Sequence, residues 1–334
     1  MPGNSFGRAL VLSSFGESHG PAVGGVLDGY PSGLPVDIPF ICSEIDRRRP
    51  GAGPEATTRR EPDEVEFVSG VFDGRSTGAP IAFLVRNTYQ RSSDYDHLEH
   101  TFRPSHADYT WEKKFGIRDH RGGGRSSARE TVVRVVAGAL VKTWLKPFGI
   151  AVTGRIASIG PFDVPPGMTG LPDVVTGWLE ELRAEGDTAG GVVECAITGV
   201  PAGLGEPVFD RLQASLAAAM LSINAVKGFE YGSGFRGTLM RGSEHNDLFV
   251  SEEGRIRTLT NHSGGIQGGI SNGEDILFRV AFKPVATLMK DQPSVDRQGR
   301  PVTVPGKGRH DVCVVPRAVV VVEAMAALVL GDHL

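Results

Sequence analysis

Cysteine is scarce in this sequence, and the patterns that pair cysteines are missing. The three cysteines, Cys42, Cys195 and Cys313, lie far apart in the chain, and no CxxC pair occurs. An odd number of isolated cysteines argues against a disulfide framework and against a cysteine-based zinc site. We interpret the three residues as reduced, buried thiols of a cytoplasmic protein.

Targeting signals and membrane-spanning runs are also missing. The most apolar run, residues 318–330, is too short to span a bilayer and carries Glu323 in its middle. The N-terminus, MPGNSFGRALVL, lacks the basic start and the continuous apolar core of a signal peptide. These absences predict a protein without a membrane partner.

The two common nucleotide-binding fingerprints do not occur either. No GxGxxG pattern follows a predicted strand, and no GxxxxGK[ST] pattern is present. The formal net charge of −4 argues against an overall nucleic-acid binder, so no nucleic-acid partner is expected. Local arginine clusters therefore need another explanation, and a nucleotide cofactor would be held without a Rossmann fold or a P-loop.

The chain is, by contrast, rich in glycine. Its 334 residues include 45 glycines and 22 prolines, which predict many turns and close approaches of the backbone to ligands. Apolar residues make up 40% of the chain and charged residues 22%, as in ordinary globular proteins with a sizeable core. The length fits one large domain or two.

A weak internal repeat organises the chain. Residues 24–35, GGVLDGYPSGLP, resemble residues 195–206, CAITGVPAGLGE, because each is a β-prone apolar stretch that runs into GxPxGL. A segment with a helical pattern follows each copy, at residues 36–48 and 207–222. In the second segment, Pro207 occupies the favoured first position of a helix.

Strands and further helices follow in the same order in both parts of the chain. Hairpins of antiparallel strands are predicted within residues 66–85 and 228–242. Apolar helices are predicted at the ends of residues 121–145 and 308–330. Residues 155–190 are expected to form a loop and then a short helix.

This order predicts an α+β fold in a single large domain over residues 1–334. Its two duplicated β-α-β-β-type halves cover about residues 1–150 and 190–334, and residues 151–189 connect them. The halves are expected to share one core, with a cleft where they meet.

The stretch DHRGGGRSSARE, residues 119–130, is the clearest candidate for anion binding. Its glycines let the backbone approach a ligand, and Ser127 with Glu130 forms an S-x-x-E capping box that opens a helix. The free amides of such a helix start attract a phosphate or a carboxylate. Three arginines add charge-assisted donors, namely Arg121, Arg125 and Arg129. A tight turn with surface arginines is the alternative.

Arginine is also dense in residues 44–64, EIDRRRPGAGPEATTRREPDE. Arg47, Arg48 and Arg49 fall at the end of a predicted helix, where the helix dipole tolerates cations. The stretch is therefore either an ordinary solvated charged face or a loop that binds an anionic ligand.

Three histidines lie close to the glycine-rich stretch. His100, His106 and His120 have no zinc-like spacing, so no metal site is predicted. A lone histidine is more often structural than catalytic. His106 is nevertheless a candidate, because Arg103 and the glycine loop are expected to lie near it.

Three other polar stretches allow two interpretations each. SFGESHGPAVG, residues 14–24, is either a polar turn or a loop that carries catalytic groups. NHSGGIQGGISNGED, residues 261–275, suits hairpin turns as well as contact with a ligand. GKGRHDVCVVPRAVV, residues 306–320, brings basic, imidazole and carboxylate groups together, either as a proton-handling site or as an ion-paired turn.

Eight motifs, in order over essentially the whole chain, make this sequence similar to the chorismate synthases. They are GESHG, DRRRPG, FRPSHADYT, RGGGRSSARET, GVPAGLGEPVFDRLQA, INAVKGFE, GGIQGGIS and GRHDVCVVPRA. The resemblance implies a fold in which helices are sandwiched between two antiparallel four-stranded sheets. It also implies a homotetramer.

The reaction implied by the resemblance belongs to the shikimate pathway of aromatic amino acid biosynthesis. It is a carbon–oxygen lyase reaction, the 1,4-anti elimination of phosphate from 5-enolpyruvylshikimate 3-phosphate to give chorismate. Reduced FMN is required, although no net redox change occurs. No appended reductase domain is visible, so we expect an external flavin reductase, with NADPH as an indirect reductant.

The resemblance also implies roles for five residues. His19, with Ser18 beside it, would act as an acid that assists departure of the phosphate. His106 would protonate or stabilise the reduced flavin, because an imidazole pKa near neutrality suits either task. Asp311 would relay the C6 proton of the substrate, and Ser127 would lie close to flavin and substrate.

Ligand contacts are implied by matching positions. Arg48 and Arg103 match arginines that hold the anionic groups of the substrate. The implied FMN contacts are Arg125, Ser126, Ser127, Asn224, Ala225, Gly268, Lys283, Pro284, Val285, Ala286, Thr287 and Arg309.

Four positions depart from the family's pattern. Pro54 stands where a substrate-binding arginine is common, Ser105 replaces a glycine, and Val312 replaces a proline. KPVAT at residues 283–287 replaces the more frequent KPTSS, which removes hydroxyl groups from an FMN-contacting loop. We expect activity to be retained and FMN to bind more weakly.

Two other functions stay open on the residues alone. One is a flavoprotein redox enzyme that acts on a phosphorylated metabolite. The other is an anion-binding or RNA-binding protein that uses the arginines of residues 47–60, although the acidic net charge counts against it.

Overall fold

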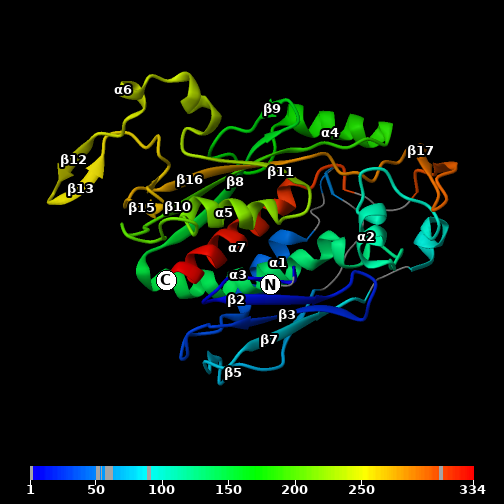
Figure 1. Cartoon of the computed structure of the whole chain (residues 1–334), viewed down its shortest axis with the longest axis horizontal. Helices are drawn as coiled ribbons and strands as arrows, with labels where there is room; N and C mark the ends of the chain where they lie inside the picture. Colours follow the sequence, from blue (N-terminus) through cyan, green and yellow to red (C-terminus); the bar gives the residue numbers. More distant parts are fainter. Residues whose placement is uncertain (1–2, 50–52, 54, 57–62, 89–91, 308–310) are drawn as a thin grey trace.

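Two antiparallel sheets enclose a layer of helices (Figure 1). The computed structural model describes residues 3–49, 53, 55–56, 63–88, 92–307 and 311–334. The first sheet has the strand order β1-β2-β3-β7-β4, and every neighbouring pair is antiparallel. Its strands are β1 (Ser5–Phe6), β2 (Val11–Gly16), β3 (Ala22–Asp28), β7 (Ile81–Arg86) and β4 (Val65–Phe67).

The second sheet has the order β11-β16-β10-β8-β9 and is also antiparallel throughout. Its strands are β11 (Val226–Tyr231), β16 (Ile276–Phe282), β10 (Gly191–Thr198), β8 (Ala151–Ile159) and β9 (Phe162–Asp163). In β16, Ile276, Phe278 and Val280 are buried, whereas the alternate residues Leu277 and Arg279 are exposed. One apolar face of the sheet is thereby turned toward the helices.

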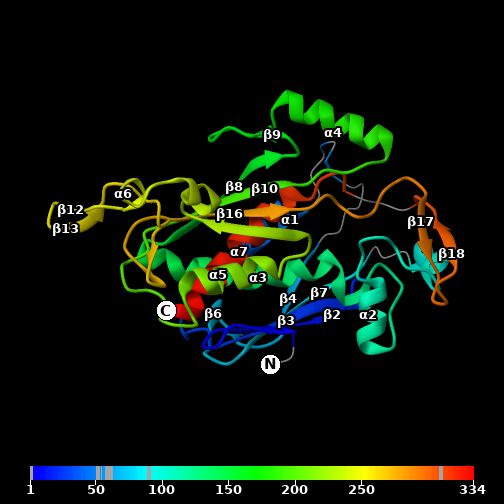
Figure 2. The same cartoon turned by 45° about the horizontal axis from the view of Figure 1, so that its top comes forward.

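Four helices fill the space between the sheets, as Figure 2 shows from a second side. They are α1 (Ile38–Arg48), α3 (Thr131–Leu145), α5 (Leu212–Leu221) and α7 (Val315–His333). Helices α3 and α7 are apolar on nearly every side, which suits complete burial between two sheets. Gly138 of α3 permits their close crossing, because a Cβ there would lie 2.4 Å from Cβ of Ala324 in α7. A continuous core with residues from both sheets results.

The remaining elements surround this sandwich. The other α-helices are α2 (Asp108–Phe115), α4 (Asp173–Glu185) and α6 (Gly242–His245). Short 3-10 helices are η1 (Ser92–Leu98), η2 (Gly124–Ser126), η3 (Ala128–Glu130), η4 (Lys146–Phe148) and η5 (Gly234–Leu239). Two-stranded hairpins are β5 (Val71–Phe72) with β6 (Arg75–Ser76), β12 (Phe249–Glu252) with β13 (Arg255–Thr258), β14 (Ile266–Gln267) with β15 (Ile270–Ser271), and β17 (Gln292–Val295) with β18 (Pro301–Val304). Within the described part of the chain, no helix combines the length and apolar character needed to cross a membrane.

A buried ion cluster neutralises the charge in the most apolar helix. Glu323 of α7 accepts hydrogen bonds from Arg47 of α1 at 2.7 Å, from Lys142 of α3 at 2.5 Å and from the backbone N–H of Gly154 in β8 at 2.8 Å. Both cations also bond to Glu44. Burial raises the pKa of Glu323, but the bonds from Arg47 and Lys142 outweigh it and hold the pKa below its ordinary value.

The predicted sandwich of helices between antiparallel sheets is confirmed, with one difference. Each sheet has five strands among the described residues and not four, because the two-residue strands β1 and β9 extend one edge of each. Cys195 and Cys313 are buried free thiols, as predicted. Cys42 is exposed, since it lies outside the stripe of α1, including Ile41 and Ile45, that faces the core.

Three local predictions were wrong. The helix expected to begin at Pro207 begins at Leu212. Residues 228–242 form no hairpin, because β11 pairs with β16 and the chain after β11 coils into η5. Residues 155–159 are not a loop but the end of β8, which pairs with both β10 and β9.

Replacing Gly138 tests how closely α3 and α7 pack. In Gly138→Ala the new methyl group would lie 2.4 Å from the Ala324 side chain, so one helix must shift. We expect the free energy of unfolding to fall by about 1–3 kcal/mol, the usual cost of overpacking a core. Urea denaturation followed by circular dichroism measures the change.

Gly177→Ala in α4 is the matched control for this substitution. No atom lies within 4 Å of the new methyl group, and the helical backbone suits alanine better than glycine. The free energy of unfolding should therefore rise by about 0.5–1 kcal/mol. Equal changes in the two variants would contradict the close crossing at Gly138.

Candidate active site

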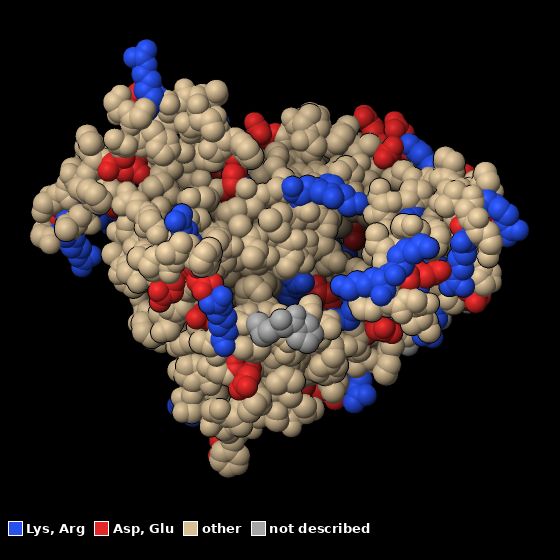
Figure 3. Space-filling view, in the orientation of Figure 1, with Lys and Arg blue, Asp and Glu red and all other residues tan. Residues whose placement is uncertain are grey.

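A cavity of about 530 Å³ opens where the two parts of the chain meet, beside the starts of α3 and α7. Its volume is typical of a site for small molecules. Five basic side chains line it: Arg48, Arg103, Lys283, Lys307 and Arg317. Apolar side chains form another part of its wall, among them Ile223, Phe282, Pro284, Val285 and Val304. Figure 3 shows lysines and arginines around a hollow on this face. The cavity suits an anionic ligand that also has an apolar surface.

His106 lies in the cavity wall and is held at both ring nitrogens. Nδ1 lies 3.0 Å from the carbonyl oxygen of Pro104, which can only accept, so Nδ1 carries a proton. Nε2 lies 3.1 Å from the hydroxyl of Thr287, which donates to the neutral ring. Burial, followed by the charge of Arg103, lowers the pKa of His106. The ring is therefore mainly neutral at pH 7, with Nε2 as an acceptor.

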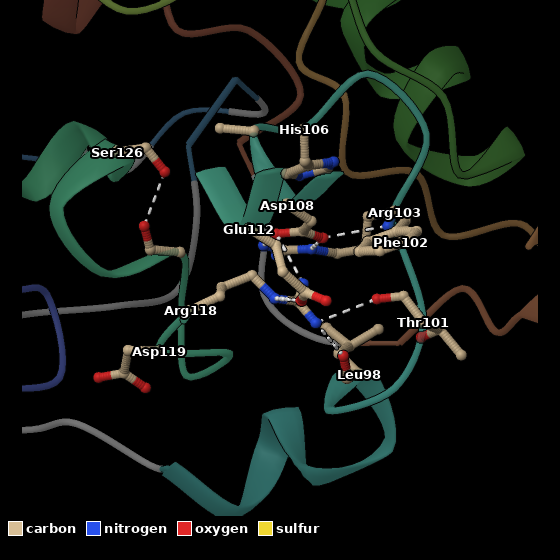
Figure 4. A network of polar contacts seen from close by, with 12 residues as sticks. Leu98, Thr101, Phe102, Arg103, His106, Asp108, Glu112, Arg118, Asp119 and Ser126 are labelled. Atoms are coloured by element: carbon tan, nitrogen blue, oxygen red, sulfur yellow. Dashed lines mark hydrogen bonds and ion pairs between the residues drawn. The ribbon is translucent and has the colours of Figure 1, made fainter. Parts of the chain in front are cut away.

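Arg103 is fixed by a carboxylate five residues further along the chain (Figure 4). Asp108 accepts from Nε and Nη2 of Arg103 at 2.8 Å each, and from the Arg103 backbone N–H at 3.0 Å. Arg118 lies 3.2 Å from the same carboxylate and donates to three carbonyl groups between residues 98 and 101. Burial raises the pKa of Asp108, but the bonds from Arg103 outweigh it and bring the pKa to about 2.

The GESHG loop between β2 and β3 buries two of its three polar side chains. Ser18 and His19 are buried, whereas Glu17 is exposed. Ser18 Oγ lies 3.1 Å from His19 Nδ1 and 3.3 Å from the carbonyl oxygen of Gly122. The His19 ring packs edge-on against Tyr95, with ring centroids 5.0 Å apart. Gly122 and Tyr95 line the cavity and His19 does not, so His19 lies directly behind the cavity wall.

The glycine-rich stretch forms a tight turn, and the predicted capping box of Ser127 with Glu130 is wrong. The φ angles are 62°, 87° and 54° at Gly122, Gly123 and Gly124. Successive left-handed residues favour glycine strongly. Ser127 accepts from the backbone N–H of Arg129 rather than that of Glu130, and Glu130 pairs with Arg134. The helix start is therefore a 3-10 turn that leads into α3.

Two arginines of this stretch differ in their surroundings. Arg121 is exposed and pairs with Asp119 at 2.8 Å. Arg125 donates through Nη2 to the backbone carbonyl of Ser14 at 2.9 Å, and its Nη1 is buried with no hydrogen-bond partner among the described residues. Burial lowers the pKa of Arg125. Arg125 therefore has a donor that suits a ligand oxygen, whereas Arg121 resembles an ordinary surface arginine.

Two further arginines are bound to one buried carboxylate. Asp63 pairs with Arg129 and lies 3.3 Å from Nη1 of Arg48. Arg48 also donates through Nε to the Thr131 hydroxyl at 3.0 Å and through Nη2 to the carbonyl of Ala128 at 3.2 Å. Arg48 lines the cavity, but much of its donor capacity is used inside the protein.

Asp311 faces the cavity as one half of an ion pair. Nη1 of Arg317, in the first turn of α7, donates to Asp311 Oδ2 at 2.5 Å. Nε of the same arginine donates to the backbone carbonyl of Arg48 at 3.0 Å. Both side chains of the pair line the cavity. The ion pair joins Asp311 to α7, while Arg309 and His310 of the GRHD stretch lie outside the described residues.

The cavity fits a flavin mononucleotide by the chemistry of its lining. Asn224 donates to the carbonyl of Ser126 at 2.9 Å, while its Oδ1 is buried without a hydrogen-bond partner among the described residues. This acceptor and the apolar wall suit a ring system with a phosphate tail, and the unpaired Nη1 of Arg125 lies in a small pocket beside the cavity. The predicted FMN residues that line the cavity are Ser126, Ser127, Asn224, Ala225, Lys283, Pro284, Val285, Ala286 and Thr287.

Other predicted residues are not brought to the cavity. Gly268 lies in the turn between β14 and β15 and does not line it. Pairing of Gly205 with Ile270 holds this hairpin beside the chain that precedes α5. Arg125 does not line the cavity itself but a small pocket next to it. Arg309 and Pro54 lie outside the described residues.

Four titratable residues of the lining were not predicted from the sequence as site residues. They are Tyr95, His97, Lys307 and Arg317. Arg317 belongs to the motif GRHDVCVVPRA, so its place beside Asp311 and the predicted helix start was a usable signal. Lys307 belongs to the basic stretch 306–320, whereas Tyr95 and His97 stand in no pattern of their own, and only the folded chain brings them to the site.

Comparison with known proteins identifies the family. A family model described as chorismate synthase matches residues 10–334. The chain belongs to the chorismate synthase family. The chorismate synthase of Christiangramia forsetii is 55% identical over 350 residues, which cover 100% of this chain and 98% of that protein. The chorismate synthase of Opitutus terrae is 52% identical over 352 residues, which cover 100% and 96%.

Similarity to a chorismate synthase extends to the fold. A crystal structure of a chorismate synthase matches with a TM-score of 0.77 at 31% identity, covering 98% of this chain and 92% of that chain. Chorismate synthases are lyases of the shikimate pathway. The resemblance drawn from the eight motifs is therefore confirmed.

Three departures from the chorismate synthase pattern have visible structural consequences. Ser105 has a φ of 58°, a left-handed conformation that explains why glycine is usual there. The backbone N–H of Val312 donates to the carbonyl of Glu55 at 2.9 Å, a bond that proline cannot make. In KPVAT, Thr287 keeps the hydroxyl that reaches His106.

Gly122→Ala tests whether His19 must keep its place behind the cavity wall. The new methyl group would lie 2.0 Å from Cε1 of His19, so the ring must move away from Ser18 and Tyr95. Small displacements of a group that takes part in a reaction are costly, so the predicted role of His19 implies a fall in turnover on the order of 100-fold. Steady-state kinetics and thermal unfolding measure activity and stability in parallel.

Gly116→Ala is the matched control for this variant. Gly116 has a similar φ of 74°, but no atom lies within 4 Å of an added Cβ. Both variants carry a similar backbone strain of about 1–2 kcal/mol. Turnover should survive only in Gly116→Ala; full turnover in Gly122→Ala would show that the position of His19 is unimportant.

Proposed function

We propose that the protein converts 5-enolpyruvylshikimate 3-phosphate to chorismate and inorganic phosphate by 1,4-anti elimination, with reduced FMN bound and no net redox change. The observation that carries this proposal is a single cavity whose lining combines five basic side chains, an apolar wall, His106 and Asp311. A substrate with one phosphate and two carboxylates needs several cations. The flavin ring needs an apolar surface and exclusion of water.

Reduced FMN would supply an electron transiently as phosphate departs and would take up the C6 proton. The residues that would hold it are those of the cavity lining around Asn224 and the KPVAT segment, with Arg125 as a donor to its phosphate. Gly268 and Arg309 are proposed from the family pattern alone. The loss of two hydroxyls in KPVAT supports weaker binding of FMN than in relatives with KPTSS.

The geometry of His106 favours one of its two implied roles. A neutral ring with a proton on Nδ1 offers the lone pair of Nε2, so it accepts a hydrogen bond or a proton and does not supply one. We therefore assign His106 to stabilising the reduced flavin as a hydrogen-bond acceptor. Thr287 holds Nε2 when no ligand does.

Proton supply to the leaving phosphate is assigned to His19. Ser18 contacts Nδ1 of His19, and the missing side chain at Gly122 leaves the ring edge next to the cavity. Asp311 is assigned to relaying the C6 proton, and Ser127 to contact with flavin and substrate. Because Arg48 already donates to protein groups, Arg103 carries more of the binding of substrate anions.

The cellular setting follows from the same proposal. Buried unpaired thiols support a reducing compartment, the cytoplasm. We propose that reduced FMN comes from an external flavin reductase, with NADPH as the indirect reductant.

Exposed apolar side chains support a homotetramer. Phe235, Leu239, Phe249 and Ile256 are between 65% and 86% exposed, and they lie on η5 and the β12–β13 hairpin at one end of the molecule (Figure 1). Exposed apolar clusters of this kind mark contact surfaces. The occupant that we propose is a second copy of the chain.

Matching strand order supports the duplication of two halves. The chain forms β2, β3, α1, β4, β7 and α3 in the first part, and β8, β10, α5, β11, β16 and α7 in the second. The spatial orders β2-β3-β7-β4 and β8-β10-β16-β11 correspond strand by strand. This correspondence supports a second half that begins at β8, near residue 151, and not at residue 190.

An anaerobic assay with chemically reduced FMN tests the proposed reaction. We expect stoichiometric release of phosphate and chorismate from 5-enolpyruvylshikimate 3-phosphate, without net consumption of reduced FMN. Oxidation of FMN in proportion to turnover would favour the redox alternative, and no phosphate release would reject the proposal. His19→Ala should lose turnover, whereas Glu17→Gln, which changes the exposed neighbour, should keep it.

The proposed homotetramer is tested by replacing exposed apolar side chains of η5 with polar ones. We expect the double variant Phe235→Ser, Leu239→Ser to sediment as a smaller species than the wild-type tetramer in analytical ultracentrifugation. Ile117→Ser is the matched control, because Ile117 is 77% exposed and follows α2 at the other end of the molecule. A wild-type protein that sediments as a monomer would contradict the proposed tetramer.

A further inference from the structure

Two groups in the cavity wall depend on a residue that does not line the cavity. Arg103 and His106 both belong to residues 103–108, which turn back on themselves before α2 (Figure 4). The N–H of His106 donates to the carbonyl of Arg103 at 3.3 Å, and the N–H of Arg103 donates to the carboxylate of Asp108 at 3.0 Å. Asp108 thus closes the turn with its side chain.

The turn contains a conformation that needs such support. Ser105 lies between Arg103 and His106 with a φ of 58°, which is unfavourable for a residue other than glycine. Strained conformations persist only where the surrounding structure fixes them. The carboxylate of Asp108 fixes this one, because it bonds to the backbone and to the side chain of Arg103 at once.

We propose that Asp108 is a positioning residue that clamps the guanidinium of Arg103 and thereby holds Arg103 and His106 in place for substrate and flavin. That Arg103 and His106 act on substrate and flavin rests on the proposed function. With Nε and Nη2 bonded to Asp108, and with no hydrogen bond from Nη1 to any described residue, Nη1 of Arg103 is the donor left for an anion.

Asp108 is itself held firmly from behind. The side chain of Arg118 is 3% exposed, pairs with Asp108 and lies 5.6 Å from the centre of the Phe102 ring. Glu112, in the next turn of α2, lies 3.7 Å from Arg118 and forms no hydrogen bond or ion pair with Arg103 or His106 among the described residues. Arg118 therefore links Asp108 to the carbonyl groups of residues 98–101, whereas Glu112 does not hold Arg103 or His106.

The clamp has an electrostatic consequence for His106. The charged groups that act on its ring are Arg103 and Asp108 from its own segment and Lys283 from the segment after β16; the Thr287 hydroxyl is its neutral partner there. Arg103 and Lys283 lower the pKa of His106, and Asp108 raises it. Without the negative charge of Asp108, the two cations act unopposed and the pKa falls further.

Asp108→Asn is the test, because it keeps the shape of the side chain and removes its charge. In the ligand-free protein, NMR titration of the His106 ring should give a lower pKa than in the wild type. The acid limb of the pH profile of kcat/KM should shift to lower pH. The KM for 5-enolpyruvylshikimate 3-phosphate should rise about ten-fold, more than kcat falls, because Arg103 loses its orientation.

Glu112→Gln is the matched control. It removes a carboxylate from the same network, and it should leave the pKa of His106 and the KM unchanged. An unchanged pKa of His106 in Asp108→Asn would overturn the proposal. A lowered pKa together with an enzyme that releases no phosphate would support the clamp and reject the proposed function, so the two failures are distinguishable.

A wild-type measurement decides the question if Asp108→Asn does not fold. The Nε–H of Arg103 should exchange with solvent much more slowly than that of Arg300, which also pairs with an aspartate but has a side chain that is 73% exposed. Equal exchange rates for the two arginines would overturn the proposal.

Discussion

The register of α7 against its neighbours depends on one buried carboxylate. Glu323 accepts hydrogen bonds from α1 and α3 in the helix layer and from β8 in the second sheet. A charge that loses its partners inside a protein costs several kcal/mol, so a shift of α7 by one turn is strongly disfavoured. The same register sets where α7 begins, and its first turn carries Arg317 and hence Asp311 into the cavity. The geometry of the site is thus fixed about two turns away from it.

Cations near the cavity fall into two groups. Arg129 and Arg48 share the one negative charge of the buried Asp63 carboxylate, and Arg317 pairs with Asp311. Lys283, Lys307 and Nη1 of Arg103 remain to bind ligands. The charge that a ligand meets is therefore smaller than the number of arginines in the sequence indicates, and it is spread over both parts of the chain.

Local patterns predicted the helices well and the strand partners poorly. The apolar segments of α3 and α7 are long and periodic, so their positions follow from sequence. The partner of β11 is β16, some 45 residues further along, and no turn signal near β11 records that pairing. The site shows the same division. Motifs around His106 and the three glycines are local and were found, whereas Tyr95 and His97 reach the cavity only through tertiary folding.

The family resemblance implies two roles for His106, and the geometry of the folded chain favours one of them. The tautomer of His106 follows from two hydrogen bonds that join residues 104, 106 and 287, which no local pattern connects.

Burial of α7 has a consequence for the order in which the chain folds. Residues 315–333 pack on β8 and β10 of the second sheet and on α1, α3 and α5, so the shared core is incomplete until that helix has been synthesised. The nascent chain must therefore leave the apolar face of β8 and β10 uncovered until α7 packs on it.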